Sequence, residues 1–488
     1  MVSQVRRVAV IGAGPSGLVA VKYLLAEKYF EQIDVFEQNS RVGGVWIHTN
    51  ADDKNRLEIP IPQISPDVPL NEPIWHEKES GRREASFVSP MYSGLETNIP
   101  KSLMEFVDQQ FDDDVQLFPR SDQILDYLER YADDIGHLIR LEHQVQSVAL
   151  HDPSRSNWKV TVKNLQTGQT TSQVYDAVVA ANGHYDVPYV PAIPGIEAWN
   201  QAYPGSIIHS KKYDSPKEFK DKKVIVVGNL ASGLDIGLQL SPIVQQPLLS
   251  SSKGPSAFFP GGVPPGRTER GEIVEFLPPG SAHRAVRFAD NTVEEGIDTI
   301  VFCTGYLYSY PFLEPLDPPV VTDGSRTLNV YQQLFYNEHP TLVFPVLPQR
   351  VTPFPLVENQ AAVFARVWSG RLSLPSKEEM RAWEEAEVSS RGSHKGFHVI
   401  PYPLDAEYLN YLYDWAEQAA RRPGLENDGQ GKKGVRWGPR EKWMRSHFGE
   451  IKFSYRILGE KRHSARSLKD IGIDLEERVK SEFGETIS

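Results

Sequence analysis

Two glycine-rich turns, each following an apolar strand and opening a helix, constrain the fold of this chain more than any other feature. The first turn is Gly12-Ala13-Gly14-Pro15-Ser16-Gly17, and the second is Gly228-Asn229-Leu230-Ala231-Ser232-Gly233. A turn of this kind places backbone N–H groups and a helix N-terminus beneath a pyrophosphate. Two such turns on one chain therefore predict two dinucleotide-binding units.

The first turn lies within a β-α-β pattern. Residues 5–11 are β-branched and apolar and predict a buried parallel strand, and residues 33–36 predict a second strand that ends at Glu37. Glu37 stands twenty residues after Gly17, where a carboxylate accepts hydrogen bonds from the adenosine ribose. Because a carboxylate would repel a 2′-phosphate, the first ligand is predicted to be FAD or NAD rather than NADP.

The second turn departs from the pattern at its middle position. It follows the apolar strand 224–227, but Leu230 replaces the middle glycine, and a side chain there would hinder close approach of the backbone to a pyrophosphate. The next strand is predicted to end at Ser250-Ser251-Ser252-Lys253, which offers hydroxyls and a cation without a carboxylate. This composition favours NADPH over NADH, held by a looser turn. A flexible serine-rich loop is the alternative.

Composition narrows the class of protein further. The chain has 488 residues, enough for two domains with their own cores, and its net charge of −12 argues against a nucleic-acid partner. Cys303 is the single cysteine and lies in an apolar run, so we expect it to be a buried small hydrophobe. A single cysteine excludes an intrachain disulfide and also the disulfide reductases, which need a redox cysteine pair. The two dinucleotides therefore point to a flavin enzyme that also binds a nicotinamide nucleotide.

The sequence gives no sign of a metal site or of export. No His and Cys cluster has the spacing of metal ligands. The apolar stretch near the N-terminus holds the first glycine turn and does not resemble a signal peptide, and no run of apolar residues is long enough to predict a membrane span. We expect a cytoplasmic enzyme.

Prolines and a glycine mark two crossings between domains. Prolines 188, 191 and 194 lie at the first crossing, and Thr304-Gly305-Tyr306 lies at the return. We predict an α/β fold with two Rossmann-like dinucleotide-binding domains, in which the smaller NADPH domain is inserted into the larger FAD domain. The expected limits are 1–200 for the first part of the FAD domain, 201–310 for the NADPH domain, and 311–488 for the completion of the FAD domain and a C-terminal helical region.

Local patterns predict the structure of several further segments. Residues 124–131 are expected to be helical, and residues 145–150 and 158–162 alternate as antiparallel strands. Residues 47–92 lack periodicity and residues 251–282 are rich in glycine and proline, so both are expected to be loops.

Residues 431–466 form a basic segment, with eleven Lys or Arg against three Glu and with interleaved aromatic residues. The favoured interpretation is a charged helical face that its aromatics pack onto an acidic body. The alternative is a surface for an anionic partner or a lipid.

A third motif, Tyr203-Pro204-Gly205-Ser206-Ile207-Ile208-His209-Ser210-Lys211-Lys212-Tyr213, resembles the F-x-G-x-x-x-H-x-x-x-Y fingerprint of the flavin-containing monooxygenases. Its glycine, histidine and last tyrosine match, and Tyr203 keeps an aromatic ring at the first position. Related Baeyer–Villiger enzymes have tryptophan at the last position and microbial N-hydroxylases have proline, so Tyr213 favours the flavin-containing monooxygenases. The resemblance covers nearly the whole chain and is closest to short fungal members.

Further segments resemble the family in the same order along the chain. They are Glu37 with Gly43-Gly44-Val45-Trp46, residues 92–108 with Thr97-Asn98, the linkers 182–185 and 303–306, and Glu358-Asn359-Gln360-Ala361. The resemblance implies FAD and NADPH as cofactors. The residues expected at FAD are Gly12, Ala13, Gly14, Pro15, Ser16, Gly17, Glu37, Gly44, Val45, Trp46, Thr97, Asn98, Val145 and Gln360, and those expected at NADPH are Gly228, Ser232, Gly233, Ser251 and Lys253.

Two of these expectations leave alternatives open. The paired glycines 43 and 44 suggest that the backbone passes close over a ring. Trp46 is equally compatible with a core position and with a cofactor wall. Asn98 is expected to be the polar catalytic group beside the flavin, but from the residues alone an asparagine before Ile-Pro is more often a turn residue.

The resemblance also implies a reaction. NADPH reduces FAD, O₂ adds to give a C4a-hydroperoxyflavin, and a small-molecule substrate with nucleophilic sulfur or nitrogen takes one oxygen atom. The protein keeps water away from the activated oxygen. His209 and Tyr213 are expected to be structural residues at the domain junction, and a homodimer is compatible with the sequence.

Two alternative functions remain open. One is Baeyer–Villiger oxygenation of a ketone, which Tyr213 disfavours. The other is an uncoupled NADPH oxidase or an NADPH-sensing protein, which only Leu230 encourages.

Overall fold

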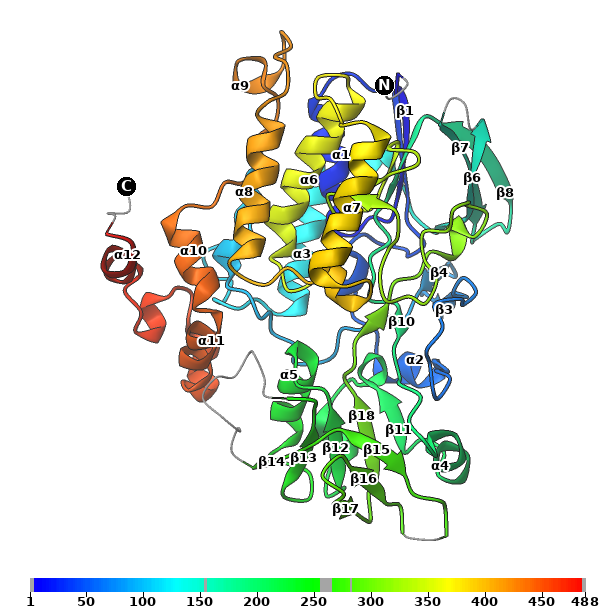
Figure 1. Cartoon of the computed structure of the whole chain (residues 1–488), viewed down its shortest axis with the longest axis vertical. Helices are drawn as coiled ribbons and strands as arrows, with labels where there is room; N and C mark the ends of the chain where they lie inside the picture. Colours follow the sequence, from blue (N-terminus) through cyan, green and yellow to red (C-terminus); the bar gives the residue numbers. More distant parts are fainter. Residues whose placement is uncertain (1–3, 153–155, 255–265, 281–282, 485–488) are drawn as a thin grey trace.

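The computed structural model describes residues 4–152, 156–254, 266–280 and 283–484. Figure 1 shows two main sheets, a larger one flanked by helices in the upper half of the view and a smaller one in the lower half. Within the described residues no helix is both long and apolar enough to cross a membrane.

The larger sheet has seven strands in the order β20-β21-β22-β9-β1-β2-β5. Their bounds are β1 (Arg7–Ile11), β2 (Gln32–Phe36), β5 (Ile139–Arg140), β9 (Ala177–Ala180), β20 (Val330–Tyr331), β21 (Phe335–Tyr336) and β22 (Leu342–Val343). Strands β22, β9, β1, β2 and β5 run parallel, as the β-branched pattern of residues 5–11 predicts. Val8 and Val10 of β1 join one hydrophobic cluster, and Ala9 and Ile11 join another, so both faces of the sheet are buried.

Each face of the larger sheet has its own cover. Helices α1 (Pro15–Ala26), α3 (Ser121–Ala132) and α6 (Pro353–Trp368) pack on one face, around the cluster that contains Val8 and Val10. The antiparallel sheet of β6 (His143–Asp152), β7 (Asn157–Asn164) and β8 (Thr170–Tyr175) packs on the other. The predicted helix at 124–131 and the predicted antiparallel pair at 145–150 and 158–162 are confirmed.

The smaller sheet repeats this plan with five parallel strands in the order β11-β18-β12-β13-β14. Their bounds are β11 (Ile207–His209), β12 (Val224–Val227), β13 (Leu248–Ser251), β14 (Arg267–Arg270) and β18 (Thr299–Phe302). Helix α5 (Ala231–Leu240) packs on one face through Ile236 and Leu240. Helix α4 (Ile196–Ala202) and the small sheet of β15 (Ile273–Phe276), β16 (Val286–Phe288) and β17 (Val293–Glu294) pack on the other.

All strands of the smaller sheet lie between β9 and β20 in the sequence, so the smaller dinucleotide domain is inserted into the larger one. The two crossings meet, because β10 (Val187–Pro188) pairs antiparallel with β19 (Tyr306–Leu307). We propose that the domain limits lie near residues 200 and 310, although α4 begins before residue 201 and packs with the smaller sheet.

Two segments predicted to be loops contain regular structure, and the prediction is wrong there. Residues 47–92 include α2 (Ala51–Arg56) and the hairpin of β3 (Ile74–Glu77) and β4 (Arg83–Ser86). Residues 251–282 include β14 and β15, while 255–265 and 281–282 lie outside the described residues. These strands are only four residues long, which is too short for alternation to stand out among prolines and glycines.

The C-terminal region is helical, as predicted. Beyond α6 it comprises α7 (Lys377–Arg391), α8 (Leu404–Ala416), α9 (Glu426–Gly429), α10 (Pro439–Ser446), α11 (Phe448–Arg456) and α12 (Leu475–Phe483). Figure 1 shows α10, α11 and α12 on the left edge of the molecule.

The basic segment 431–466 packs through its aromatics, since Trp437, Trp443 and Tyr455 are buried. Many of its cations pair with acids on the rest of the body, in the ion pairs Lys432–Asp108, Lys433–Glu417, Arg436–Asp414, Arg445–Asp405 and Arg456–Asp235. The geometry matches the favoured interpretation of a charged face on an acidic body.

Candidate functional site

The first glycine turn is closed so tightly that its glycines have no room for a side chain. Gly12 has a φ of +99°, and a Cβ atom there would lie 2.7 Å from the Ala181 carbonyl oxygen. A Cβ atom on Gly17 would lie 1.9 Å from the Gly12 carbonyl oxygen, which brings α1 directly onto the end of β1. Pro15 and Ser16 begin α1, so the helix N-terminus opens at the turn.

Glu37 lies beside this turn, at the end of β2, with its carboxylate fully buried. Its Oε2 atom accepts from the Ala13 N–H at 2.7 Å, and its Oε1 atom accepts from the backbone N–H and the amide of Asn39 at 2.8 and 2.9 Å. Burial raises the pKa of Glu37, while these N–H groups lower it. Asn39 was not among the expected site residues, because nothing in the sequence indicates that its amide turns back to Glu37.

The segment after β2 passes directly over the first turn. The Gly43 N–H donates to the Ala13 carbonyl at 3.0 Å, and a Cβ atom on Gly44 would lie 2.9 Å from the Gly14 Cα atom. The paired glycines therefore permit close contact with the backbone of the turn, and their passage over a ring stays a prediction. Trp46 is half-buried against the cluster of α1 and α6, and the Val45 carbonyl accepts from the Ser89 hydroxyl.

The second turn has nearly the same geometry as the first. Gly228 has a φ of +104°, and a Cβ atom there would lie 2.6 Å from the Cys303 carbonyl oxygen. A Cβ atom on Gly233 would lie 1.9 Å from the Gly228 carbonyl oxygen, the distance found at Gly17. Ser232 lies in the first turn of α5. The expected looser turn is absent from the described geometry of this segment.

Leu230 fits this turn because its backbone is extended. Its φ and ψ are −85° and −164°, close to the −77° and −176° of Gly14, and any residue adopts such angles. The Leu230 side chain is 42 % exposed. The substitution therefore changes the space above the helix N-terminus and leaves the path of the chain unchanged.

A cationic group missing from the sequence prediction lies near the end of β13. Ser251 is buried and donates to the Gly271 carbonyl at 2.9 Å, and the exposed Lys253 pairs with Glu272 at 3.1 Å. Arg270 lies opposite Ser251 in β14, and its buried Nε atom makes no hydrogen bond to the described residues. A guanidinium with a spare buried donor fits a phosphate group. The pairing of Arg270 with Ser251 across two strands cannot be predicted from spacing in the sequence.

The segment that holds Asn98 is anchored on both sides of that residue. The Thr97 N–H donates to the Pro119 carbonyl, and the Thr97 hydroxyl donates to the Ile99 carbonyl, both at 2.9 Å. Asn98 itself is half-buried, and its amide makes no hydrogen bond to the described part of the chain. A polar side chain is thus left available on a fixed backbone.

Gln360 and Val145 have their contacts inside the protein. Gln360 is fully buried in α6, and its Oε1 atom accepts from the Val346 N–H at 2.7 Å. Val346 has a φ of +59°, a strained value for a β-branched residue, so this bond supports an unfavourable turn. Val145 is buried in β6 and packs in the cluster that contains Phe36.

The fingerprint residues connect the two domains. His209, at the end of β11, donates from Nε2 to the Gly305 carbonyl at 3.0 Å and accepts at Nδ1 from the Lys211 N–H at 3.1 Å. Burial lowers the pKa of His209 to about 3, so the ring is neutral. The Tyr213 hydroxyl donates to Gln239 of α5 at 2.9 Å. This geometry favours a structural role for both residues.

Two turns shaped for pyrophosphates fit FAD and NADPH, since one lies beside the buried Glu37 and the other near Arg270, which pairs with Glu294 at 3.6 Å but keeps its buried Nε donor without a hydrogen bond to the described residues. A family profile described as flavin-binding monooxygenase-like matches residues 73–258 and 273–427, and one described as an NAD(P)-binding Rossmann-like domain matches residues 10–76. The chain belongs to the flavin-containing monooxygenase family, and its cofactors are FAD and NADPH.

Relatives in plants and fungi span most of the chain. Flavin-containing monooxygenase FMO GS-OX-like 2 of Arabidopsis thaliana is 34 % identical over 439 residues, covering 84 % of this chain and 85 % of its own. The thiol-specific monooxygenase of Saccharomyces cerevisiae is 29 % identical over 439 residues, covering 87 % of this chain and 88 % of its own.

Solved structures share the fold. The S-allyl-L-cysteine S-oxygenase of Allium sativum superposes with a TM-score of 0.75 at 27 % identity, covering 99 % of this chain and all of that one. An open crystal structure of cyclohexanone monooxygenase superposes with a TM-score of 0.54 at 15 % identity, covering 84 % of this chain and 97 % of that one, which shows likeness of fold alone.

Proposed function

We propose that this monooxygenase uses NADPH and O₂ to oxygenate a small molecule at a nucleophilic sulfur or nitrogen atom. The observation that carries the proposal is the available Asn98 amide on an anchored backbone. A donor that needs no rearrangement stabilises developing charge most effectively. We therefore assign Asn98 as the residue whose amide donates a hydrogen bond to the reacting oxygen.

The other assigned residues bind and orient the cofactors. The N–H groups of the first turn hold the FAD pyrophosphate, and Glu37 accepts from the ribose hydroxyls. The second turn and Arg270 hold NADPH at its pyrophosphate and its 2′-phosphate. When bound, FAD supplies the oxygen chemistry, through the C4a-hydroperoxyflavin that the resemblance implies.

Sulfur is the favoured substrate atom. The thiol-specific monooxygenase of Saccharomyces cerevisiae and the S-allyl-L-cysteine S-oxygenase of Allium sativum are named for sulfur substrates, and both align over most of this chain. Tyr213 stands where Baeyer–Villiger enzymes have tryptophan, which argues against a ketone. A thiol, an amine and a cyclic ketone, offered in turn to the reduced and oxygenated enzyme, distinguish these substrate classes by which one speeds reoxidation.

The direct test of Asn98 is the variant Asn98→Ala. We expect it to retain FAD but to shorten the life of the oxygenated flavin by roughly a hundredfold or more, since loss of one such donor costs at least about 2.7 kcal/mol. Stopped-flow absorbance after mixing the NADPH-reduced enzyme with O₂ gives this lifetime. The control is Asn55→Ala, an exposed position on α2. An unchanged lifetime in Asn98→Ala removes this residue from the mechanism.

A second candidate function, an NADPH oxidase or sensor without a substrate, rests on Leu230. Its exposed side chain lies at the turn assigned to the NADPH pyrophosphate. An enzyme of this kind would return all reducing equivalents as H₂O₂ whatever substrate is added.

A cytoplasmic location and a homodimer stay predictions, for which cell fractionation and sedimentation are the measurements.

A further inference from the structure

Helix α11 (Phe448–Arg456) contacts the segment that carries Asn98 through a buried lysine. The Lys452 ammonium donates to the Thr97 carbonyl at 2.6 Å and lies 4.1 Å from the centre of the Phe118 ring. Only 8 % of Lys452 is exposed. A buried ammonium is costly unless it is paired, so a residue that served only to pack this position would be apolar.

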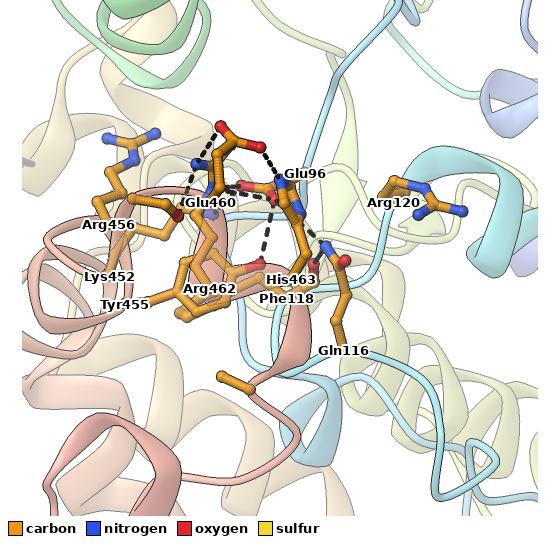
Figure 2. A network of polar contacts seen from close by, with 12 residues as sticks. Glu96, Gln116, Phe118, Arg120, Lys452, Tyr455, Arg456, Glu460, Arg462 and His463 are labelled. Carbon is orange, nitrogen blue, oxygen red and sulfur yellow. Dashed lines mark hydrogen bonds and ion pairs between the residues drawn. The ribbon is translucent and has the colours of Figure 1, made fainter.

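A cluster of charged and polar side chains compensates the buried ammonium. The Lys452 ammonium lies 4.0 Å from the Glu96 carboxylate, which accepts from the Tyr455 hydroxyl at 3.1 Å and is 3.4 Å from both Arg462 and His463. Figure 2 shows these side chains converging on Glu96 from the C-terminal region. Glu96 immediately precedes Thr97, so the cluster holds the segment at two successive residues.

The same helix contacts the NADPH domain. Arg456 pairs with Asp235 of α5 at 2.9 Å, and Asp235 also accepts from the Tyr92 hydroxyl at 2.8 Å. Tyr92 precedes Asn98 by six residues. Helix α11 therefore connects the Asn98 segment with the helix that opens at the second glycine turn.

We propose that Lys452 is a positioning residue that holds the Asn98 amide in its working orientation by fixing the Thr97 carbonyl. The Thr97 carbonyl and the Asn98 N–H belong to one planar peptide unit, so a bond to that oxygen also fixes the direction in which the Asn98 backbone begins. The proposal rests on the proposed function, in which Asn98 acts on the reacting oxygen.

Burial and the surrounding charges both act on the ionisation of Lys452. Burial, together with the charges of Arg456 and Arg462, lowers its pKa to about 7, against the opposing effect of Glu96 and Asp235, which raise it. Tyr455 and His463 also face the cluster through Glu96. An arginine at position 452 would keep the charge and the donor, which makes Lys452→Arg the conservative variant.

The test compares Lys452→Met with Lys452→Arg and with Lys461→Met, a control at an exposed lysine in the same region. The first readout is hydrogen–deuterium exchange of residues 92–100 in the FAD-loaded enzyme. The second is the lifetime of the oxygenated flavin. We expect Lys452→Met to speed exchange and to shorten the lifetime by about tenfold, as the loss of one charged hydrogen bond implies. FAD content and the Kd for NADP⁺ are expected to stay as in the wild type.

Lys452→Arg is expected to restore both readouts to within about threefold of the wild type, a difference of well under 1.4 kcal/mol. Wild-type exchange and lifetime in Lys452→Met would overturn the proposal, and so would loss of FAD together with both effects, since that pattern marks general unfolding. If the methionine variant does not fold, Lys452→Leu, which also lacks a donor for the Thr97 carbonyl, replaces it under the same criteria. A further outcome separates this proposal from the proposed function. If the wild type forms no oxygenated flavin but Lys452→Met still exchanges faster, the proposed function is contradicted while the contact between Lys452 and Thr97 is supported.

Discussion

At the scale of single residues, the two glycine turns depend on whether a position has room for a Cβ atom and on the φ angle that it requires. Gly12 and Gly228 need positive φ, whereas Leu230 replaces a glycine whose φ any residue adopts. The sequence pattern ranks all three positions alike, so it predicted a looser second turn. Only the dihedral angles distinguish a position where glycine is required for a positive φ from one where any residue can adopt the backbone angles.

Buried polar residues are hardest to predict at this scale. In the sequence Lys452 is one of many cations on a charged face, and Gln360 is expected at the flavin from the family resemblance alone, which stays a prediction. The structure places Lys452 against the Thr97 carbonyl and Gln360 against Val346. Their partners lie far away in the sequence, and no local spacing encodes such contacts.

Glu358 gives a prediction for stability against pH. Burial raises its pKa to about 8, against a usual value of 4.5, while the Val107 N–H, 3.2 Å away, partly offsets this. Between these pH values the native state holds a proton that the unfolded chain releases, so this group lowers the free energy of unfolding as pH rises.

Glu358→Gln removes this effect, because the amide stays neutral and can still accept from Val107. We expect the free energy of unfolding of the variant, relative to the wild type, to rise between pH 5 and 8 by up to about 1.4 kcal/mol per pH unit. Guanidinium unfolding at several pH values measures it, with the exposed Glu385→Gln as control. A difference that does not change with pH would contradict the assignment.

At the scale of elements, long periodic segments are predictable and short ones are not. The strand at residues 5–11, the helix at 124–131 and the strand at 224–227 were all located from their hydrophobic pattern. The hairpin of β3 and β4 was missed, because its strands are brief and pair only with each other. Two strands of four residues each contain too few alternating apolar residues for the hairpin to be predicted from the sequence.

The equivalent glycines of the two turns allow a matched experiment. A Cβ atom added at Gly17 or at Gly233 meets a carbonyl oxygen at 1.9 Å, which pushes the helix away from its strand. Overpacking of this kind costs about 1–3 kcal/mol, so each site is expected to lose affinity by roughly fivefold or more.

We expect Gly17→Ala to lose bound FAD, and Gly233→Ala to keep FAD while binding NADP⁺ more weakly. Flavin absorbance per chain and titration with NADP⁺ measure the two effects. Gly136→Ala is the control, because a Cβ atom there meets nothing within 4 Å. Full flavin content in Gly17→Ala would mean that the first site is misassigned.

At the scale of the whole molecule, two similar domains are joined by contacts from distant parts of the chain. The crossings pair through β10 and β19, His209 reaches Gly305, and α11 contacts both the Asn98 segment and α5. The sequence predicted the insertion of one domain into the other from the two crossings, at prolines 188, 191 and 194 and at Thr304-Gly305-Tyr306. The bridging role of α11 depends on tertiary packing and became visible only in the structure.

The central claim is that this assembly transfers one atom of O₂ to a soft nucleophile. The most direct measurement is turnover of the FAD-loaded enzyme with NADPH, ¹⁸O₂ and a thiol, an amine or a cyclic ketone, with the products examined by mass spectrometry. We predict a product that carries one ¹⁸O atom on sulfur or nitrogen. Conversion of all NADPH oxidised into H₂O₂ with every substrate, or labelling of the ketone alone, would contradict the account.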